Sequence, residues 1–440
     1  MKRTILMLSL AALVSGCGIF GKAGKKITPT VGERKAVLGF EAGVEVDPAL
    51  AGVAVTLPAA VANSDWTQPG GNAAKSLGHL ALGGALTPAF SISIGVGSSK
   101  YERLGAPPVV ADGRVYTVDV DGAVRAFDAS TGATVWSGKP GPKGDDDAAR
   151  FGGGVSYGDG RVYATNGLGS VSALDAKTGA VAWSVRPGGP LRGAPTVAEG
   201  NVYVMSQDSQ IYSLKPSDGT TLWSQAAALE LAGVFGAGAP AFAQGTVVAG
   251  FASGDLNAYR YENGRPLWQD ALARTSISIS VSSLSDIDAN PVIDSGRVYA
   301  LGQGGRMVAL ELVTGQRIWE LNIAGIATPW VAGEWLFVVT DDARLMCIAR
   351  ATGKIRWISQ LARYEDAEDK EGPISWVGPI LAGNRLILAN SAGQLVNVSP
   401  TDGAVQSTTA LNRGVSLSPV VAKNMLYILD DDGRLTAYRG

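Results

Sequence analysis

The chain has 440 residues, of which 46% are hydrophobic, and its formal net charge is −2. A nearly neutral chain without a large basic cluster is a poor partner for nucleic acid. One histidine and two cysteines leave little material for a histidine-based metal site or for acid–base catalysis. The length exceeds what one ordinary core needs, which favours a fold that grows by repetition.

The first residues have the features of an export signal. Residues 1–16 begin with Lys2 and Arg3 and continue with a short apolar run. The run is too short to span a bilayer but is typical of a signal-peptide core. Small residues directly before Cys17 resemble a bacterial lipobox, which implies cleavage at this point and acylation (palmitate included) of Cys17. The mature chain would then reach the membrane through its lipid anchor only; an ordinary signal peptide with an incidental cysteine is the alternative.

The residues after the cysteine predict a location and a tether. In enterobacterial lipoproteins an aspartate directly after the cysteine favours the inner membrane, so Gly18 implies by resemblance the outer membrane, facing the periplasm. Residues 17–62 are rich in Gly, Ala and Lys, and their apolar residues follow no sustained period. We predict a flexible tether here, with docking of part of it as a strand left open.

Residues 63–440 are predicted to form one domain built from repeats. Val124–Trp136 (VRAFDASTGATVW) and Val171–Trp183 (VSALDAKTGAVAW) are near copies of each other, and edited versions recur further along the chain. Each unit contains four short apolar runs separated by Asp-Gly, Thr-Gly or similar turn pairs. Four antiparallel strands in a unit of about 40 to 50 residues describe a propeller blade. The predicted fold is therefore all-β, an eight-bladed β-propeller.

The fourth strand of a unit is marked by an aromatic slot. Its occupants are Trp136, Trp183, Trp223, Trp268, Trp319 and Trp357, followed by Gln406 in the seventh unit and Phe90 for the eighth. The last unit stops one strand short, whereas Thr87–Ile92 precedes the first full unit and has the fourth-strand pattern. We predict that this N-terminal strand completes the last blade. The aromatic residues are expected to pack between blades as core.

The remaining chemistry-bearing residues have structural interpretations. We expect His79 to be structural or exposed, and Cys347 to be a core residue, because no base accompanies it. The charged loops 139–154 and 363–372 are interpreted as solvated surface, and Trp376 as a partly exposed candidate contact. No catalytic residue, metal ligand or cofactor site is predicted.

The repeat A-x-D-x-x-T-G-x-x-x-W, present at Ala126–Trp136 and Ala173–Trp183, resembles that of quinoprotein-type (PQQ-like) propellers. Dehydrogenases of that type bind pyrroloquinoline quinone and a metal, and many carry two adjacent cysteines, which this chain lacks. A lipobox followed by an eight-bladed propeller of this length resembles the BamB family, lipoproteins of the outer-membrane β-barrel assembly machinery. That resemblance implies a non-enzymatic scaffold without a cofactor.

Two segments strengthen the second resemblance. Residues 189–195 (GPLRGAP) resemble the family's L-R-G…A-P loop, and residues 284–291 (LSDIDANP) resemble its L-S-D-x-D-x-x-P loop. The resemblance implies that both dock on a periplasmic POTRA domain of BamA, the barrel-forming partner. Gly189 stands where many relatives carry an apolar contact residue, which implies a smaller anchor here.

Four residues of these loops are the predicted partner-binding residues. Leu191 is expected to be an exposed apolar anchor, and Arg192 a planar multi-donor group at the interface centre. Asp286 and Asp288 alternate on an extended segment, so they are expected to point the same way and to pair with Arg192 or with a basic partner residue. The alternative is that the two carboxylates bond only loop backbone and that Arg192 pairs only with them.

The leading functional hypothesis is a scaffold that binds BamA and joins other assembly-machinery subunits. Unfolded outer-membrane proteins are further candidate partners, through β-augmentation at exposed strand edges. Two alternatives stay open at this point: a lipid-anchored PQQ-dependent oxidoreductase, and a propeller that binds a sugar or polymer in the envelope.

Overall fold

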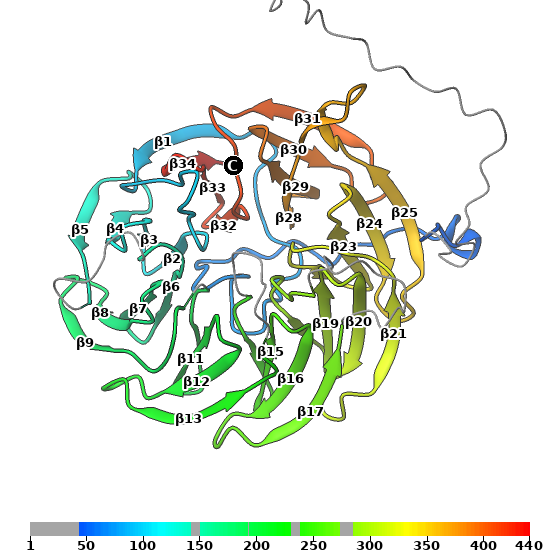
Figure 1. The fold of residues 1–440 in the computed structure, drawn as a ribbon. Coiled ribbons are helices and arrows are strands. Elements are labelled where there is room, and N and C mark those ends of the chain that lie inside the picture. Colours follow the sequence, from blue (N-terminus) through cyan, green and yellow to red (C-terminus); the bar gives the residue numbers. More distant parts are fainter. Residues whose placement is uncertain (1–43, 142–149, 192, 230–237, 273–284) are drawn as a thin grey trace, which may run out of the picture. The chain divides into compact units, whose positions relative to one another are not determined.

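The computed structural model describes residues 44–141, 150–191, 193–229, 238–272 and 285–440. The predicted signal peptide and Cys17 lie outside the described residues. Within these ranges the chain forms eight four-stranded antiparallel sheets arranged as the blades of a ring (Figure 1), as predicted. Short hydrophobic runs between turns with positive φ form the strands, and the inner strands are the buried ones.

The first four blades follow each other along the chain, innermost strand first. Blade 1 comprises β2 (Val109–Ala111), β3 (Arg114–Val118), β4 (Val124–Asp128) and β5 (Thr134–Gly138). Blade 2 comprises β6 (Val155–Gly158), β7 (Arg161–Thr165), β8 (Val171–Asp175) and β9 (Val181–Val185). Blade 3 comprises β10 (Thr196–Ala198), β11 (Asn201–Ser206), β12 (Gln210–Leu214) and β13 (Thr221–Ala226). Blade 4 comprises β14 (Ala241–Ala243), β15 (Thr246–Gly250), β16 (Asp255–Arg260) and β17 (Pro266–Ala271).

The second half of the ring repeats this order. Blade 5 comprises β18 (Val292–Asp294), β19 (Arg297–Gly302), β20 (Arg306–Glu311) and β21 (Arg317–Leu321). Blade 6 comprises β22 (Trp330–Ala332), β23 (Trp335–Val339), β24 (Arg344–Ala349) and β25 (Ile355–Gln360). Blade 7 comprises β28 (Trp376–Ala382), β29 (Arg385–Asn390), β30 (Gln394–Val398) and β31 (Val405–Ala410). Between blades 6 and 7 lies a separate hairpin of β26 (Tyr364–Asp366) and β27 (Glu371–Pro373).

Blade 8 combines strands from two distant parts of the chain. Its inner strands are β32 (Val420–Ala422), β33 (Met425–Leu429) and β34 (Arg434–Arg439), and its outer strand is β1 (Thr87–Ser93). β1 pairs antiparallel with β34, with Phe90 opposite Ala437. Backbone hydrogen bonds of one sheet therefore join the start of the propeller to its end.

Adjacent blades are joined through the aromatic slot. Each slot tryptophan donates its indole N–H to a backbone carbonyl of the next blade; the acceptors are Ala176, Pro216, Tyr261, Leu312, Arg350 and Pro400, at 2.7 to 3.1 Å. The ring also lies against the turn glycine of that next blade, as Trp223 lies against Gly264. At the blade 8 to blade 1 junction, Phe90 has no donor, and the Tyr427 hydroxyl donates to Ala129 O at 3.0 Å instead. The aromatic residues therefore pack between adjacent blades, as predicted.

The predicted position of Gln406 in this slot was wrong. Ser407 faces Asn397 in blade 7, as Trp136 faces Ala126 in blade 1, so Ser407 occupies the slot. A slot residue packs on the turn between the third and fourth strands of the following blade. Blade 8 has no such turn, because its third strand ends at the C-terminus and its fourth strand comes from residues 87–93. A tryptophan at position 407 would therefore lack the turn glycine against which the others pack.

A stretch without regular secondary structure crosses the axis of the ring (Figure 1). We name residues 61–83 the central segment. It hydrogen-bonds the innermost strand of every blade; the strand residues are Val110, Tyr157, Val197, Phe242, Ile293, Trp330, Leu381 and Val421. These contacts lie close to the turns between first and second strands, as with Asp112 N to Asp65 Oδ1 at 3.1 Å. The central segment therefore fills the axis on the face that carries those turns.

Residues ahead of the central segment also contact the ring. Val46 forms a parallel bridge with Ile355 at the outer edge of blade 6, and Asp47 N donates to Ile355 O at 2.9 Å. The 3-10 turn η1 (Pro48–Leu50) follows, and Arg356 Nε donates to Val53 O at 2.7 Å. This part of the predicted tether, from residue 44 on, belongs to the same compact unit as the propeller.

Candidate functional site: a loop face of the ring

One face of the ring carries both predicted docking loops. In an antiparallel four-stranded blade, the loop leading into the first strand and the turn between strands two and three lie on the same face. Backbone bonds confirm this arrangement here: Gln207 N donates to Pro190 O at 2.8 Å and Gln303 N to Asp286 O at 2.9 Å. We name this side the loop face; the central segment lies near the opposite one. The loops before blades 3 and 5 thus open on one side, separated by the entrance to blade 4.

Leu191 is not the exposed anchor that we expected. Its side chain is 0% exposed and packs in a cluster with Tyr163 and Tyr212. Its backbone N–H donates to Asn166 O at 3.2 Å, which ties the loop to the preceding blade. Leu191 therefore anchors the loop to the core, in which its apolar side chain is buried. Arg192 lies outside the described residues.

The second loop presents two carboxylates of different exposure. Asp286 is buried, at 1% exposure, whereas Asp288 is half-buried. Ile287 between them is buried, and its N–H donates to Phe251 O at 3.2 Å, so this apolar residue holds the loop on blade 4. Asp288 Oδ2 has no hydrogen-bond partner among the described residues. That oxygen is itself buried, and Asp288 is the more exposed of the two residues.

A third carboxylate near this loop escaped the sequence analysis. Burial, reinforced by the negative charges of Asp286 and Asp341, raises the pKa of Asp288 to about 7. Asp341 stands between the second and third strands of blade 6, and burial raises its pKa as well. The position of Asp341 in the repeat could have revealed it, because the turn between the second and third strands of a blade must lie on the loop face. The loop face is therefore acidic between blades 5 and 6.

Other expectations concern residues away from the loops. His79 is buried, and its two ring nitrogens contact Pro58 O at 2.8 Å and Asn384 N at 3.1 Å, which is a structural role. Cys347 is buried, and burial raises the pKa of its thiol. Trp376, expected to be partly exposed, is buried at 7% exposure and donates its indole N–H to Ala362 O at 2.8 Å. That expectation was wrong because Trp376 lies on β28, the innermost strand of blade 7, and packs in the main hydrophobic core.

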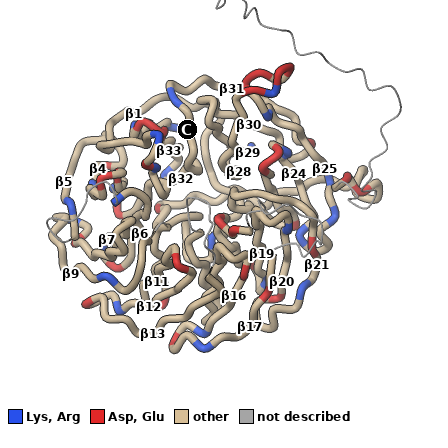
Figure 2. Tube along the Cα trace, in the orientation of Figure 1, with Lys and Arg blue, Asp and Glu red and all other residues tan. Residues whose placement is uncertain are grey.

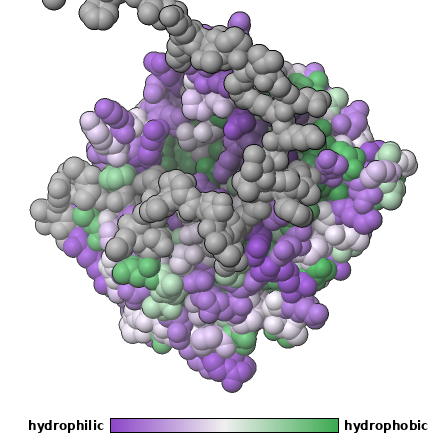
Figure 3. All heavy atoms as spheres, turned by 45° about the vertical axis from the view of Figure 1, so that its right-hand side comes forward, coloured by the Kyte–Doolittle hydropathy of each residue, from purple (hydrophilic) through white to green (hydrophobic). Residues whose placement is uncertain are grey.

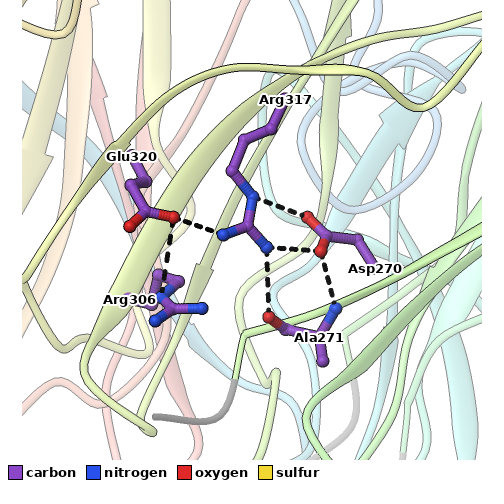
Figure 4. Close-up of polar contacts among 5 residues, drawn as sticks. All are labelled: Asp270, Ala271, Arg306, Arg317 and Glu320. Atoms are coloured by element: carbon purple, nitrogen blue, oxygen red, sulfur yellow. Dashed lines mark hydrogen bonds and ion pairs between the residues drawn. The ribbon is translucent and has the colours of Figure 1, made fainter. Parts of the chain in front are cut away.

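The outer circumference differs in charge from blade to blade. The outer strands of blades 4 and 5 are linked by an ion-pair network in which Arg317 binds Asp270 and Glu320, and Arg306 lies 3.9 Å from Glu320 (Figure 4). Figure 2 shows both signs of charge spread around the ring rather than gathered in one basic region. On the face drawn in Figure 3, hydrophobic residues form small groups among hydrophilic ones.

Metal-ligating clusters and membrane-spanning helices are both absent from the described ranges. No group of three or more His, Cys, Asp or Glu side chains there is placed to hold a metal ion. Within the same ranges, no helix has the length and hydrophobicity needed to traverse a bilayer.

Comparison with known proteins places the fold and the family. The family model of outer membrane protein assembly factor BamB matches residues 95–146, 121–359 and 365–440. The factor of that name from Yersinia pestis is 27% identical over 357 residues, covering 80% of this chain and 88% of the relative. The one from Escherichia coli K12 is 28% identical over 391 residues, covering 79% and 87%.

Solved structures show the same fold. The crystal structure of BamB from Moraxella catarrhalis superposes with a TM-score of 0.65 at 20% identity, covering 81% of this chain and 100% of that one. A europium-containing methanol dehydrogenase superposes with a TM-score of 0.68 at 13% identity, covering 86% and 98%. Structural likeness thus extends to a dehydrogenase as well as to a BamB, whereas the family model that matches the sequence is that of BamB. Because the family model matches most of the chain, this protein belongs to the family of outer membrane protein assembly factor BamB.

Proposed function

We propose that this protein is a non-enzymatic lipoprotein scaffold of the outer-membrane β-barrel assembly complex, aiding the folding and insertion of outer-membrane proteins. Family membership supports a role in outer-membrane protein assembly. The acylated Cys17 tethers the ring to the outer membrane on its periplasmic side. The loop face binds a POTRA domain of BamA, and other subunits of the machinery join the same complex.

The observation that carries the docking proposal is the placement of the two loops. Both open on the loop face, and the second carries the half-buried Asp288, one of whose carboxylate oxygens is buried without a partner among the described residues. A half-buried carboxylate is a strong acceptor for a lysine or arginine of a partner. In this proposal Leu191 supports its loop from the core, and Asp286 shapes the second loop. Arg192 and Asp288 make the outside contacts.

The test is recovery of BamA from solubilised membranes with the tagged full-length chain. Replacing Arg192→Ala together with Asp288→Asn is expected to lower recovery at least about tenfold, because truncating one partner of a desolvated charged pair costs a few kcal/mol. Asp218→Asn is the matched control, since Asp218 is an exposed carboxylate in the turn between β12 and β13, on the opposite face. Undiminished recovery with a folded double variant would remove these residues from the interface.

No observation favours the quinoprotein alternative over the scaffold. The methanol dehydrogenase likeness, at 13% identity, shows the fold alone. A near-ultraviolet chromophore that copurifies with the full-length chain would reopen this alternative.

A further inference from the structure

β31, the outer strand of blade 7, is the most exposed of the described outer strands. β31 pairs with β30 on one side, and no other described strand pairs with its second side. All six residues from Val405 to Ala410 are exposed, and none of them is charged. Because successive side chains of a strand point to opposite faces, exposure of all six means that both faces of β31 are open.

The outer strands of blades 4, 5 and 6 carry the protection that β31 lacks. Charged side chains on an edge strand are a common device against pairing with another chain. β17 has Asp270, and β21 has Arg317 and Glu320, whose ion pairs join these two edges (Figure 4). In blade 6 the outer strand carries Arg356, and its edge is covered by Val46.

The uncharged outer strands of blades 1, 2, 3 and 8 are held differently. Each has an aromatic slot residue that packs on the turn glycine of the following blade, as Phe90 of β1 packs on Gly132. β31 has Ser407 in the slot and no third-to-fourth-strand turn to pack against. Blade 7 therefore combines an uncharged edge with an outer strand that makes no aromatic contact to the next blade.

This chain already shows an outer edge accepting an extended segment. Val46 bridges Ile355 in parallel, and Asp47 N donates to Ile355 O at 2.9 Å, which is backbone pairing at the rim of blade 6. The occupant comes from outside the repeats, so the rim geometry allows a strand to be added beside a fourth strand.

We propose that the free edge of β31 binds one extended strand of an unfolded outer-membrane β-barrel protein by β-augmentation. This inference rests on the proposed function, which supplies such chains as clients. Strands of transmembrane barrels are about ten residues long, alternate apolar and polar residues and carry little charge. Such a strand matches an uncharged edge with both faces open, and it gains backbone hydrogen bonds that require no particular sequence.

The experiment places a photoreactive side chain at Thr408 in the lipidated full-length protein. The probe is a urea-denatured transmembrane β-barrel chain diluted into buffer. A photoreactive group at Gln269 is the matched control, because both positions follow the slot residue by one, on β31 and on the charged edge of β17. We expect crosslinking to the probe from position 408 at least fivefold above that from position 269.

A second pair of variants tests the edge itself, with the photoreactive group at Ala410. Gln406→Lys with Thr408→Lys should reduce crosslinking at least fivefold, whereas the matched Leu267→Lys with Gln269→Lys should leave it unchanged. Equal crosslinking from both edges, insensitivity to the added charge, or crosslinking only to a second copy of this chain would overturn the proposal. BamA recovery through the loop face is measured separately, so loss of this inference and loss of the proposed function give different results.

Discussion

Lys75 is a buried cation in the central segment, and it makes the clearest prediction at the scale of single residues. Its side chain is 2% exposed, and its ammonium donates to Thr196 Oγ1 at 3.1 Å. Burial lowers its pKa from 10.5 to about 7. The folded state therefore binds fewer protons than the unfolded state between about pH 7 and 10.5. Below this window Lys75 is charged in both states, and burial of the charge lowers the free energy of unfolding. This loss fades as the pH rises through the window.

Lys75→Met should therefore increase the free energy of unfolding at pH 7, on the order of 2 kcal/mol. The gain should shrink as the pH approaches 10. Denaturant unfolding at several pH values measures both effects, and Lys177→Met, at an exposed site, should change stability by less than about 0.5 kcal/mol. A destabilised Lys75→Met protein would mean that the buried ammonium contributes more through hydrogen bonds than it loses through burial.

At the scale of elements, the turn glycines test the aromatic slot. Gly264 has φ +70, and a Cβ there would lie 2.6 Å from the ring of Trp223. Gly200 also has φ +70, but a Cβ there would have nothing within 4 Å. Gly200→Ala should cost only the left-handed backbone penalty of about 1 kcal/mol. Gly264→Ala should cost roughly 1 to 3 kcal/mol more, because the indole must also move.

Thermal or denaturant unfolding of the two variants gives the comparison directly. Equal destabilisation would show that the slot tolerates a shifted ring and that the turn needs glycine for backbone reasons alone. The same contact explains Ser407: its blade has no turn glycine opposite, so nothing in that junction selects an aromatic residue. Counting along the sequence put Gln406 in this slot because no tryptophan marked the position, whereas strand pairing identified Ser407.

At the scale of the whole molecule, the join in blade 8 controls closure of the ring. β34 lies between β33 and β1, so deleting Gly433–Gly440 removes the strand that connects both ends of the propeller. We expect this chain to lose its cooperative thermal transition. Circular dichroism during heating is the measurement, and a melting curve like that of the intact chain would contradict the role of the join.

A deletion of similar size elsewhere is the control. The hairpin β26–β27 pairs only with itself, and its flanks are already joined by Ile374 N donating to Arg363 O at 2.9 Å. Replacing Tyr364–Pro373 by two glycines should shift the melting temperature by only a few degrees, because little core is lost. The two deletions separate closure of the ring from simple loss of residues.

The sequence by itself determined the repeated unit, the eight blades and the core role of the tryptophans. Local sequence patterns indicate these features, because turn glycines, alternating strands and an aromatic residue recur at a regular spacing. Each copy needs its neighbours to bury its apolar face. The same local pattern in Thr87–Ile92 indicated a fourth strand outside any full unit, and this strand is β1.

Only the tertiary structure decided the path of the central segment, the burial of Leu191 and the setting of Asp288. The central segment has no period, because its partners are eight different strands rather than its own neighbours. A leucine between a proline and an arginine suggests an exposed loop, yet Tyr163 and Tyr212 from blades 2 and 3 enclose it. The pKa of Asp288 likewise depends on Asp341, more than fifty residues away along the chain but near it on the loop face. Such contacts join residues through space, so no local pattern records them.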